Sequence, residues 1–142
     1  GNNATIDEVA GTPIAEGYIG TCTNGRLVDF AVAARILKGR HIHPDCRLVV
    51  APASKQIYLD AMEAGYIQTF VEAGACIVTP GCGPCVGTHN GVPSNGENVI
   101  STANRNFKGR MGNSSSFIYL GSPATVAASV LNARITDPRE YL

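Results

Sequence analysis

Cys82 and Cys85 are two cysteines separated by two residues. In this 142-residue chain, no other spacing of residues points so directly to chemistry. They lie in the stretch PGCGPCVG, residues 80–87, which is too rich in glycine and proline for a regular helix or strand. Two thiolates at this spacing can bind one metal ion or one face of an inorganic cluster, and the glycines let backbone amides approach the sulfurs. The first question is therefore which metal chemistry, if any, this loop supports.

A third cysteine, Cys22, occupies a turn between a predicted strand and a predicted helix. The strand is expected at residues 17–21, and apolar residues at three- and four-residue steps predict the helix at residues 27–37. Such a turn offers free backbone amides and the positive end of a helix dipole, and both favour the thiolate form that a metal needs. Cys22 is therefore a second candidate position for a metal ligand.

The elements that must position these cysteines alternate between strand and helix along the chain. This alternation predicts an α/β fold, a three-layer α/β/α sandwich with a mainly parallel sheet. Cys22 and the Cys82/Cys85 pair each follow a strand, and loops at the carboxyl ends of parallel strands are where α/β sheets place their sites. The further expected elements are strands at 46–51, 75–79, 98–102 and 117–120 and helices at 54–64, 66–73 and 124–133.

The composition and charge of the chain limit the kinds of partner that it is expected to bind and the cell compartment in which it is expected to work. Lys plus Arg and Asp plus Glu are 11 each, so the net charge is zero and predicts neither a nucleic-acid nor a membrane-surface partner. No apolar run approaches the roughly 20 residues that span a bilayer, and no secretory signal is visible. Five unevenly spaced cysteines suit a reducing compartment. We expect a soluble, cytoplasmic chain with a lead-in or linker at residues 1–16 and one domain at residues 17–142.

Several interpretations of the cysteines compete. A thioredoxin-like redox centre also uses Cys-Gly-Pro-Cys, but it begins a long helix that Gly87 and the residues after it would break. A structural zinc site wants four ligands, and His89 is the nearby candidate for the fourth. Cys46 and Cys76 lie in apolar strands and are expected to be small buried side chains. The three loop cysteines that remain could hold a [4Fe-4S] cluster, whose fourth iron would stay open as a Lewis acid.

Four motifs together resemble the aconitase superfamily, in order and over nearly the whole chain. They are IGTCTN at residues 19–24, CGPC at 82–85, NRNFKGR at 104–110 and the GSP helix start at 121–123. The variants of the first and third motifs are most similar to the branch that contains the large subunits of 3-isopropylmalate dehydratases and homoaconitases.

The resemblance implies a metal centre and a substrate site. Cys22, Cys82 and Cys85 would ligate three irons of a [4Fe-4S] cluster, and the fourth iron would bind substrate. Asn104, Arg105 and Arg110 fall on positions that contact the cluster region and substrate in this superfamily. The charge of the two arginines is consistent with these roles, because an anionic cluster and a carboxylate substrate need cations nearby. Arginine can also bind a carboxylate at two points.

The resemblance also implies that this chain works with further protein. It would be the cluster-bearing third domain of a hydro-lyase large subunit in leucine biosynthesis, or alternatively of a homoaconitase, isomerising a hydroxy di- or tricarboxylic acid by dehydration and rehydration. Its partners would be the remaining domains of the large subunit and a small subunit with a swivelling domain. The small subunit would supply the base, so no general acid or base is expected in this chain. The alternative from another class is a redox or zinc-binding module.

Overall fold

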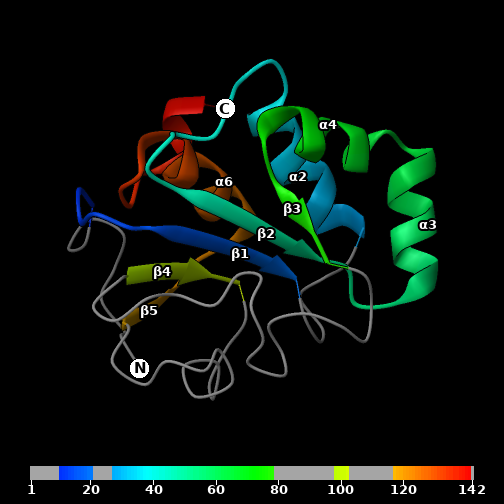
Figure 1. Ribbon diagram of the computed structural model, residues 1–142, viewed down its shortest axis with the longest axis horizontal. Helices are drawn as coiled ribbons and strands as arrows, with labels where there is room; N and C mark the ends of the chain where they lie inside the picture. The colour runs from blue at the N-terminus through cyan, green and yellow to red at the C-terminus, as the bar shows by residue number, and fades with distance from the viewer. Residues whose placement is uncertain (1–9, 21–26, 79–97, 103–116, 142) are drawn as a thin grey trace.

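The computed structural model describes residues 10–20, 27–78, 98–102 and 117–141 (Figure 1). These ranges contain five strands and four α-helices, and a short 3-10 helix follows the last of them. In chain order the elements are β1 (Glu16–Gly20), α2 (Leu27–Leu37), β2 (Arg47–Ala51), α3 (Lys55–Glu63), α4 (Tyr66–Ala73), β3 (Cys76–Ile77), β4 (Asn98–Ser101), β5 (Phe117–Leu120), α6 (Pro123–Asn132) and η3 (Pro138–Tyr141).

The five strands form one sheet in the order β3-β2-β1-β4-β5, and every pairing is parallel. β1 is the central strand, with Glu16 opposite Arg47 of β2 and opposite Val99 of β4. Because the strands are parallel, all five finish at one end of the sheet, which we call the carboxyl end. The opposite end, where the strands begin, is the amino end. The predicted α/β class with a mainly parallel sheet is confirmed.

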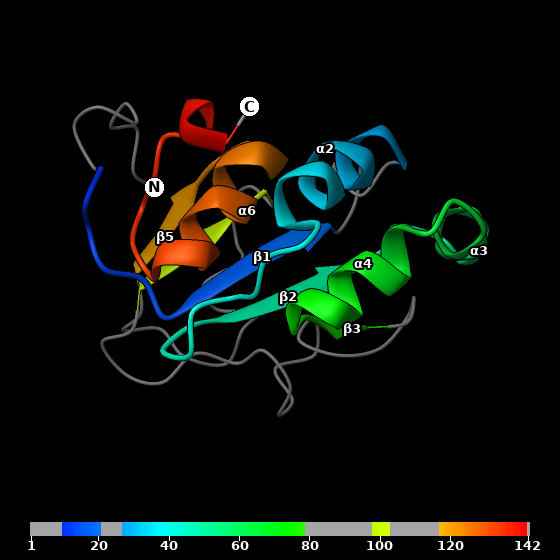
Figure 2. The same cartoon turned by 90° about the horizontal axis from the view of Figure 1, so that it is seen from above.

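Helices α2, α4 and α6 lie on one face of the sheet (Figure 2). The main core forms between this face and helices α2, α4 and α6. Phe30 of α2 and Phe70 of α4 meet edge to face inside it, with ring centroids 5.8 Å apart. The second helical layer of the expected sandwich is not among the described residues. No helix in the described part of the chain is long and apolar enough to cross a membrane.

Helix α3 matches the predicted span but not the predicted buried face. Ser54 caps it by accepting a hydrogen bond from the Ile57 amide, and Ala61 is fully buried. The apolar pattern of residues 54–64 predicts that Ile57, Ala61 and Met62 face inward. Met62 is 49% exposed, so for this residue the prediction is wrong. The reason is tertiary, because α3 packs on α4 and on part of α2 and does not lie on the sheet.

Cys76 is a second correction. The sequence predicts a buried strand here, but β3 has two residues, lies at one side of the sheet and leaves Cys76 exposed. Cys76 is opposite Val49 of β2, and the described helices do not cover this face. Cys46 is only partly buried and packs beside the core. The Cys76 thiol is free, and the Cys46 thiol donates to the Arg47 carbonyl at 3.8 Å.

The end of the expected lead-in segment is tied to the domain. The Gly11 amide donates to the Ile135 carbonyl at 2.8 Å, and Pro13 forms an antiparallel bridge with Arg134. Ile14 is 5% exposed and belongs to the core. These contacts join residues 11–14 to the segment after α6 at the amino end of the sheet.

Candidate metal centre

The structure locates the strands that lead to the candidate site residues. The residues themselves, Cys22, Cys82, Cys85, Asn104, Arg105 and Arg110, lie outside the described ranges. Cys22 comes two residues after the end of β1, and Asn104 comes two residues after Thr102, which follows β4. Cys82 comes four residues after Val78, which follows β3.

These three strands all finish at the carboxyl end of the sheet. β1 and β4 are neighbours, whereas β2 separates β1 from β3. Because neighbouring strands are about 4.8 Å apart, the ends of β1 and β3 are separated by roughly 10 Å. The segments that carry the candidate ligands therefore start from the same end of the molecule.

Gly20, the last residue of β1, has a backbone conformation that side chains rarely adopt. Its φ is +131°, and a Cβ at this position would overlap the carbonyl oxygen of Ala51 at the end of β2. The ends of β1 and β2 thus approach each other closely, immediately before the segment that contains Cys22. Only glycine provides both the conformation and the space.

Thr102 connects the end of β1 to the end of β4. Its hydroxyl accepts a hydrogen bond from the Gly20 amide at 3.0 Å, and it lies 3.4 Å from the Gly20 carbonyl, to which it donates. The Thr102 amide donates to the Tyr18 carbonyl at 3.0 Å. Thr102 is 7% exposed, so these bonds are made away from bulk water.

The residue after β3 is also fixed before its chain continues toward Cys82. The Val78 amide donates to the Val50 carbonyl at 2.9 Å. Its side chain is buried in a small apolar cluster with Tyr18, Val49 and Ala51, on the sheet face opposite the main core. The chain therefore leaves β3 from an ordered, buried position.

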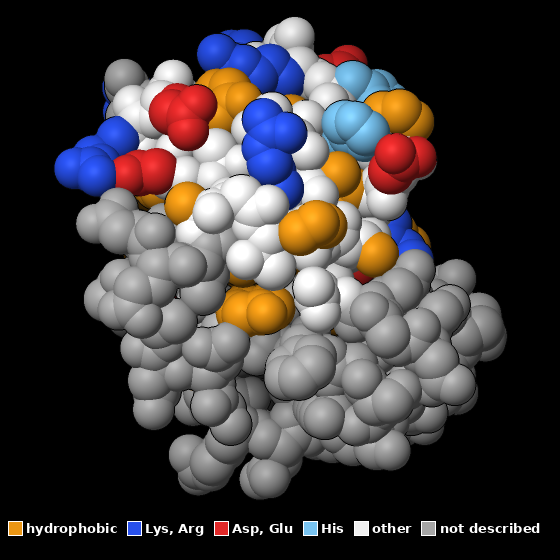
Figure 3. All heavy atoms as spheres, turned by 90° about the vertical axis from the view of Figure 1, so that its left-hand side faces the viewer, with side chains coloured by type: hydrophobic (Ala, Val, Ile, Leu, Met, Phe, Trp, Pro, Cys, Tyr) orange, Lys and Arg blue, Asp and Glu red, His pale blue; other side chains and the backbone are white. Residues whose placement is uncertain are grey.

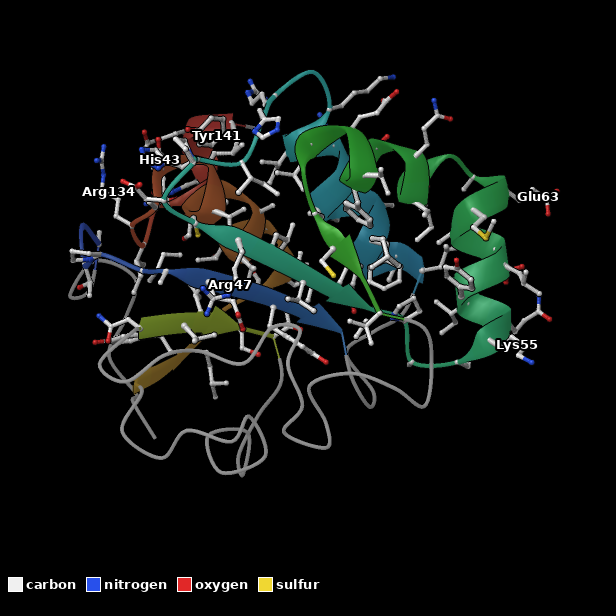
Figure 4. All side chains as sticks on the ribbon, viewed as in Figure 1. His43, Arg47, Lys55, Glu63, Arg134 and Tyr141 are labelled. Carbon is white, nitrogen blue, oxygen red and sulfur yellow. The ribbon has the colours of Figure 1, made fainter. Side chains whose placement is uncertain are left out.

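Helix N-termini bring positive potential to the carboxyl end of the sheet. Helices α2, α3 and α6 begin shortly after β1, β2 and β5 end, so their positive dipole ends are near this end. Ser54 caps α3, and Ser122 caps α6 by accepting from the Thr125 amide at 3.1 Å. Lys55 projects from the first turn of α3 on the side toward which β1 points (Figure 4). This potential suits an anionic group.

The amino end carries charges of both signs. Figure 3 views the molecule from this end and shows acidic, basic and histidine side chains close together on the described surface. Exposed residues in this region are Arg40, His41, Asp45, Arg134, Arg139 and Glu140. The Arg139 guanidinium, by hydrogen bonding to the Asp137 carboxylate, holds the pKa of Asp137 below its usual value. This mixed surface has no dominant sign for attracting an anion.

One ion pair at the amino end is buried on one side. The Nε of Arg47 donates to Oε1 of Glu16 at 2.6 Å, with Glu16 fully buried and Arg47 half-exposed. The two residues are opposite each other on β2 and β1, and the Arg47 side chain reaches across the sheet (Figure 4). The sequence alone did not single out this pair, because nothing local marks two residues 31 positions apart as partners.

The candidate metal ligands remain the three loop cysteines. Within the described ranges, no three His, Cys, Asp or Glu side chains come together in a way that could hold a metal ion. The sequence motifs included Gly20 but did not point to Thr102. Their hydrogen bond joins residues 82 positions apart, and its only sequence signal is that each residue lies at or next to the end of a predicted strand.

Comparison with known proteins identifies the family of this fold. The profile of the aconitase family (aconitate hydratase) matches residues 2–133. The chain belongs to the aconitase family. This aconitase-family chain is 59% identical, over 141 residues, to 3-isopropylmalate dehydratase large subunit 2 of Archaeoglobus fulgidus, covering 99% of this chain and 34% of that protein.

Two further relatives show the same partial coverage. The 3-isopropylmalate dehydratase large subunit 1 of Thermotoga maritima is 57% identical, over 91% of this chain and 31% of that protein. The methanogen homoaconitase large subunit of Methanocaldococcus jannaschii is 54% identical, over 96% of this chain and 32% of that protein. The chain therefore spans about a third of the length of the curated relatives it matches.

Membership in the aconitase family implies an iron–sulfur cluster. The donor set of the chain fits such a group, because thiolates are the ligands that these clusters use. The described structure fits it as well: three strands that lead to candidate residues end together, next to helix N-termini of the sign that an anionic cluster needs.

Proposed function

We propose that this chain is the cluster-bearing part of a hydro-lyase large subunit of the 3-isopropylmalate dehydratase type. The enzyme would isomerise a hydroxy di- or tricarboxylic acid by removing and then re-adding water. The observation that carries the proposal is the 59% identity to a 3-isopropylmalate dehydratase large subunit over 141 residues. A parallel sheet with chemistry-bearing segments at its carboxyl end supports it.

We propose Cys22, Cys82 and Cys85 as the three protein ligands of a [4Fe-4S] cluster. The lengths of the connecting segments support this set. An extended chain covers about 3.5 Å per residue, so Cys22 can lie up to about 7 Å from Gly20 and Cys82 up to about 14 Å from Val78. Together these reaches exceed the roughly 10 Å between the ends of β1 and β3. No strand needs to move for the three sulfurs to meet.

Three thiolates leave one iron of such a cluster open, and when bound this iron would act as a Lewis acid on the substrate's hydroxyl oxygen. The proposed role of Arg105 and Arg110 is to hold substrate carboxylates through bidentate hydrogen bonds, while Asn104 orients substrate beside them. Because the net charge of the chain is zero, an anionic substrate has to be held by local cations such as these arginines. The base that removes the proton would come from outside this chain.

The proposed partners follow from the relatives. Because they are large subunits about three times as long as this chain, we propose that the remaining large-subunit domains and a small subunit complete the site. The chain alone would then be inactive. Substrate discrimination would come from side chains in those other parts.

Anaerobic reconstitution of the full-length large subunit with iron and sulfide tests the ligand set. The wild type should bind about four irons per chain, with the absorption and paramagnetic spectra of a [4Fe-4S] cluster. Cys22→Ser should lose this species. Cys46→Ser is the matched control, because Cys46 is a partly buried thiol at the amino end of the sheet and should have no effect. One tightly held zinc ion in the wild type would support a zinc module and contradict the proposal.

Homoaconitase activity is the second candidate, because a homoaconitase large subunit is 54% identical over 96% of the chain. The full-length large subunit, assembled with its small subunit, should be assayed with isopropylmalate and with homocitrate. The proposal expects the higher kcat/KM with isopropylmalate. A preference for homocitrate would establish the second candidate, and turnover of neither substrate would contradict both.

A further inference from the structure

We propose that Thr102 is a positioning residue for the metal centre, a role that rests on the function proposed above. Its hydroxyl would fix the direction in which the chain leaves β1 toward Cys22 relative to the direction in which it leaves β4 toward Asn104. The juxtaposition that carries this is the pair of hydrogen bonds between Thr102 Oγ1 and the backbone of Gly20.

The hydroxyl takes the place of a main-chain group in the sheet. The ladder between β1 and β4 runs to Tyr18 opposite Ser101, and the next bond joins the Thr102 amide to the Tyr18 carbonyl. A regular parallel ladder would continue from the Gly20 amide to the carbonyl of Thr102. Here the side-chain hydroxyl of Thr102 accepts that amide at 3.0 Å. The pairing is thus extended by a side chain at the point where both strands end.

A threonine hydroxyl is well suited to this place because it has one proton and two lone pairs. It accepts from the Gly20 amide and donates to the Gly20 carbonyl. One side chain therefore binds both backbone polar groups of Gly20. Gly20 is also held on its other side, because its Cα abuts the Ala51 carbonyl of β2. The last residue before the Cys22 segment is therefore fixed by both neighbouring strands.

The diagnostic substitution is Thr102→Val, which keeps the branched shape and removes the hydroxyl. The Gly20 amide then loses the Thr102 hydroxyl as an acceptor, and the two side-chain hydrogen bonds between the ends of β1 and β4 are removed. We expect iron release to a chelator to become about tenfold faster, the factor that corresponds to a typical single hydrogen bond to a buried group. The paramagnetic spectrum of the reduced cluster should broaden as well. Thr102→Ser, which restores the hydroxyl, should return both properties toward the wild type.

Thr136→Val is a matched control. Thr136 is 5% exposed, its hydroxyl donates to the Arg134 carbonyl at 2.8 Å, and it accepts from the Asn132 side chain at 3.2 Å. It therefore has similar burial and one donated and one accepted hydrogen bond, but it follows the segment that pairs with Pro13 at the amino end. Both variants should lose similar stability. Only Thr102→Val should change the cluster.

The experiment uses the full-length large subunit with its small subunit, and it has two readouts besides activity. The first is iron release and the paramagnetic spectrum of the four proteins after reconstitution. The second is hydrogen exchange of the Gly20 amide in the metal-free subunit, which should be faster in Thr102→Val and unchanged in Thr136→Val.

The outcomes separate this role from the proposed function. Normal cluster uptake by the wild type with equal iron release in Thr102→Val and Thr136→Val would overturn the positioning role alone. A wild type that binds no iron would contradict the proposed function and with it the role. Unchanged Gly20 exchange in Thr102→Val would overturn the hydrogen-bond tie itself, whatever the metal content.

Discussion

Gly20 is the residue at which three strands are brought together. Its amide and carbonyl bond to the Thr102 hydroxyl beside β4, and its Cα abuts the Ala51 carbonyl of β2. A backbone at φ +131° is open to glycine and strained for other residues. The requirement for glycine thus comes from crowding and from conformation at once.

Gly20→Ala should lower the free energy of unfolding by about 3 kcal/mol or more, because it adds strain and a steric overlap with Ala51. The matched control is Gly39→Ala, since Gly39 also has a positive φ, +76°, but a Cβ added there would have no atom within 4 Å. That variant should lose about 1 kcal/mol from conformation alone. Urea unfolding of both measures the difference, and equal losses would show that the contact with Ala51 is not tight.

The ion pair of Glu16 and Arg47 allows a second residue-level prediction. Arg47→Met leaves a fully buried carboxylate without its guanidinium partner, so it should lower the free energy of unfolding by about 2 to 4 kcal/mol. Adding Glu16→Gln removes the buried charge and should recover part of that loss. Chemical unfolding of the two single variants and the double variant gives the coupling energy. Strict additivity would contradict an energetic link between them.

At the scale of elements, helix α6 packs tightly on β1 because the β1 residue that it contacts is Gly17, which has no side chain. A Cβ at Gly17 would meet methyl carbons of Val130 and of Val126, the latter at 2.9 Å. Both valines are fully buried on α6. The helix therefore sits closer to the central strand than any other residue at position 17 would allow.

Gly17→Ala should lower the free energy of unfolding by about 1 to 3 kcal/mol through overpacking. Val130→Ala removes the nearer methyl carbons, so the double variant should be more stable than the sum of the two single losses predicts. Thermal unfolding of the three variants checks this. Additive losses would mean that α6 shifts away from β1 without strain.

Elements with a local signal were predictable from the sequence. The helix predicted at residues 27–37 has those bounds in α2, because its three- and four-residue apolar spacing is local. Met62 and Cys76 were assigned wrongly because their exposure depends on where α3 and β3 lie in the molecule. A sequence pattern does not distinguish a helix on the sheet from a helix on other helices, or a central strand from an outer one.

The residues of the candidate site also differ in whether a local sequence signal reveals them. The spacing and loop composition around Cys22, Cys82 and Cys85 make them visible in the sequence, and their role as ligands stays a prediction. Thr102 has no such local signal, because its partner Gly20 is 82 residues earlier and the two meet only through strand order. Chemistry-bearing residue types were therefore found, whereas the residue that we propose positions them was not.

At the scale of the whole molecule, the two ends of the described chain meet. The Ile135 amide donates to the Thr12 carbonyl and the Gly11 amide to the Ile135 carbonyl, each at 2.8 Å. Ile14, which follows these paired residues, is part of the main core. Residues 11–14 are thus part of the folded unit, at the amino end of the sheet.

Ile14→Ala should lower the free energy of unfolding by about 2 to 4 kcal/mol, because it opens a cavity in the main core. It should also speed hydrogen exchange at Gly11 and Ile135 while leaving iron release unchanged. Val71→Ala serves as the control, since Val71 is 56% exposed on α4 and should change little. Slow exchange at Gly11 in Ile14→Ala would show that the end pairing does not depend on core packing.

The pairing of Pro13 with Arg134 has a practical consequence for immobilised enzyme. A linker attached in the exposed turn at Gly39, at the amino end of the sheet, would leave the carboxyl ends of the five strands pointing away from a support. Because Pro13 and Arg134 pair at the same end of the sheet, the described segments before β1 and after α6 would both lie beside that support.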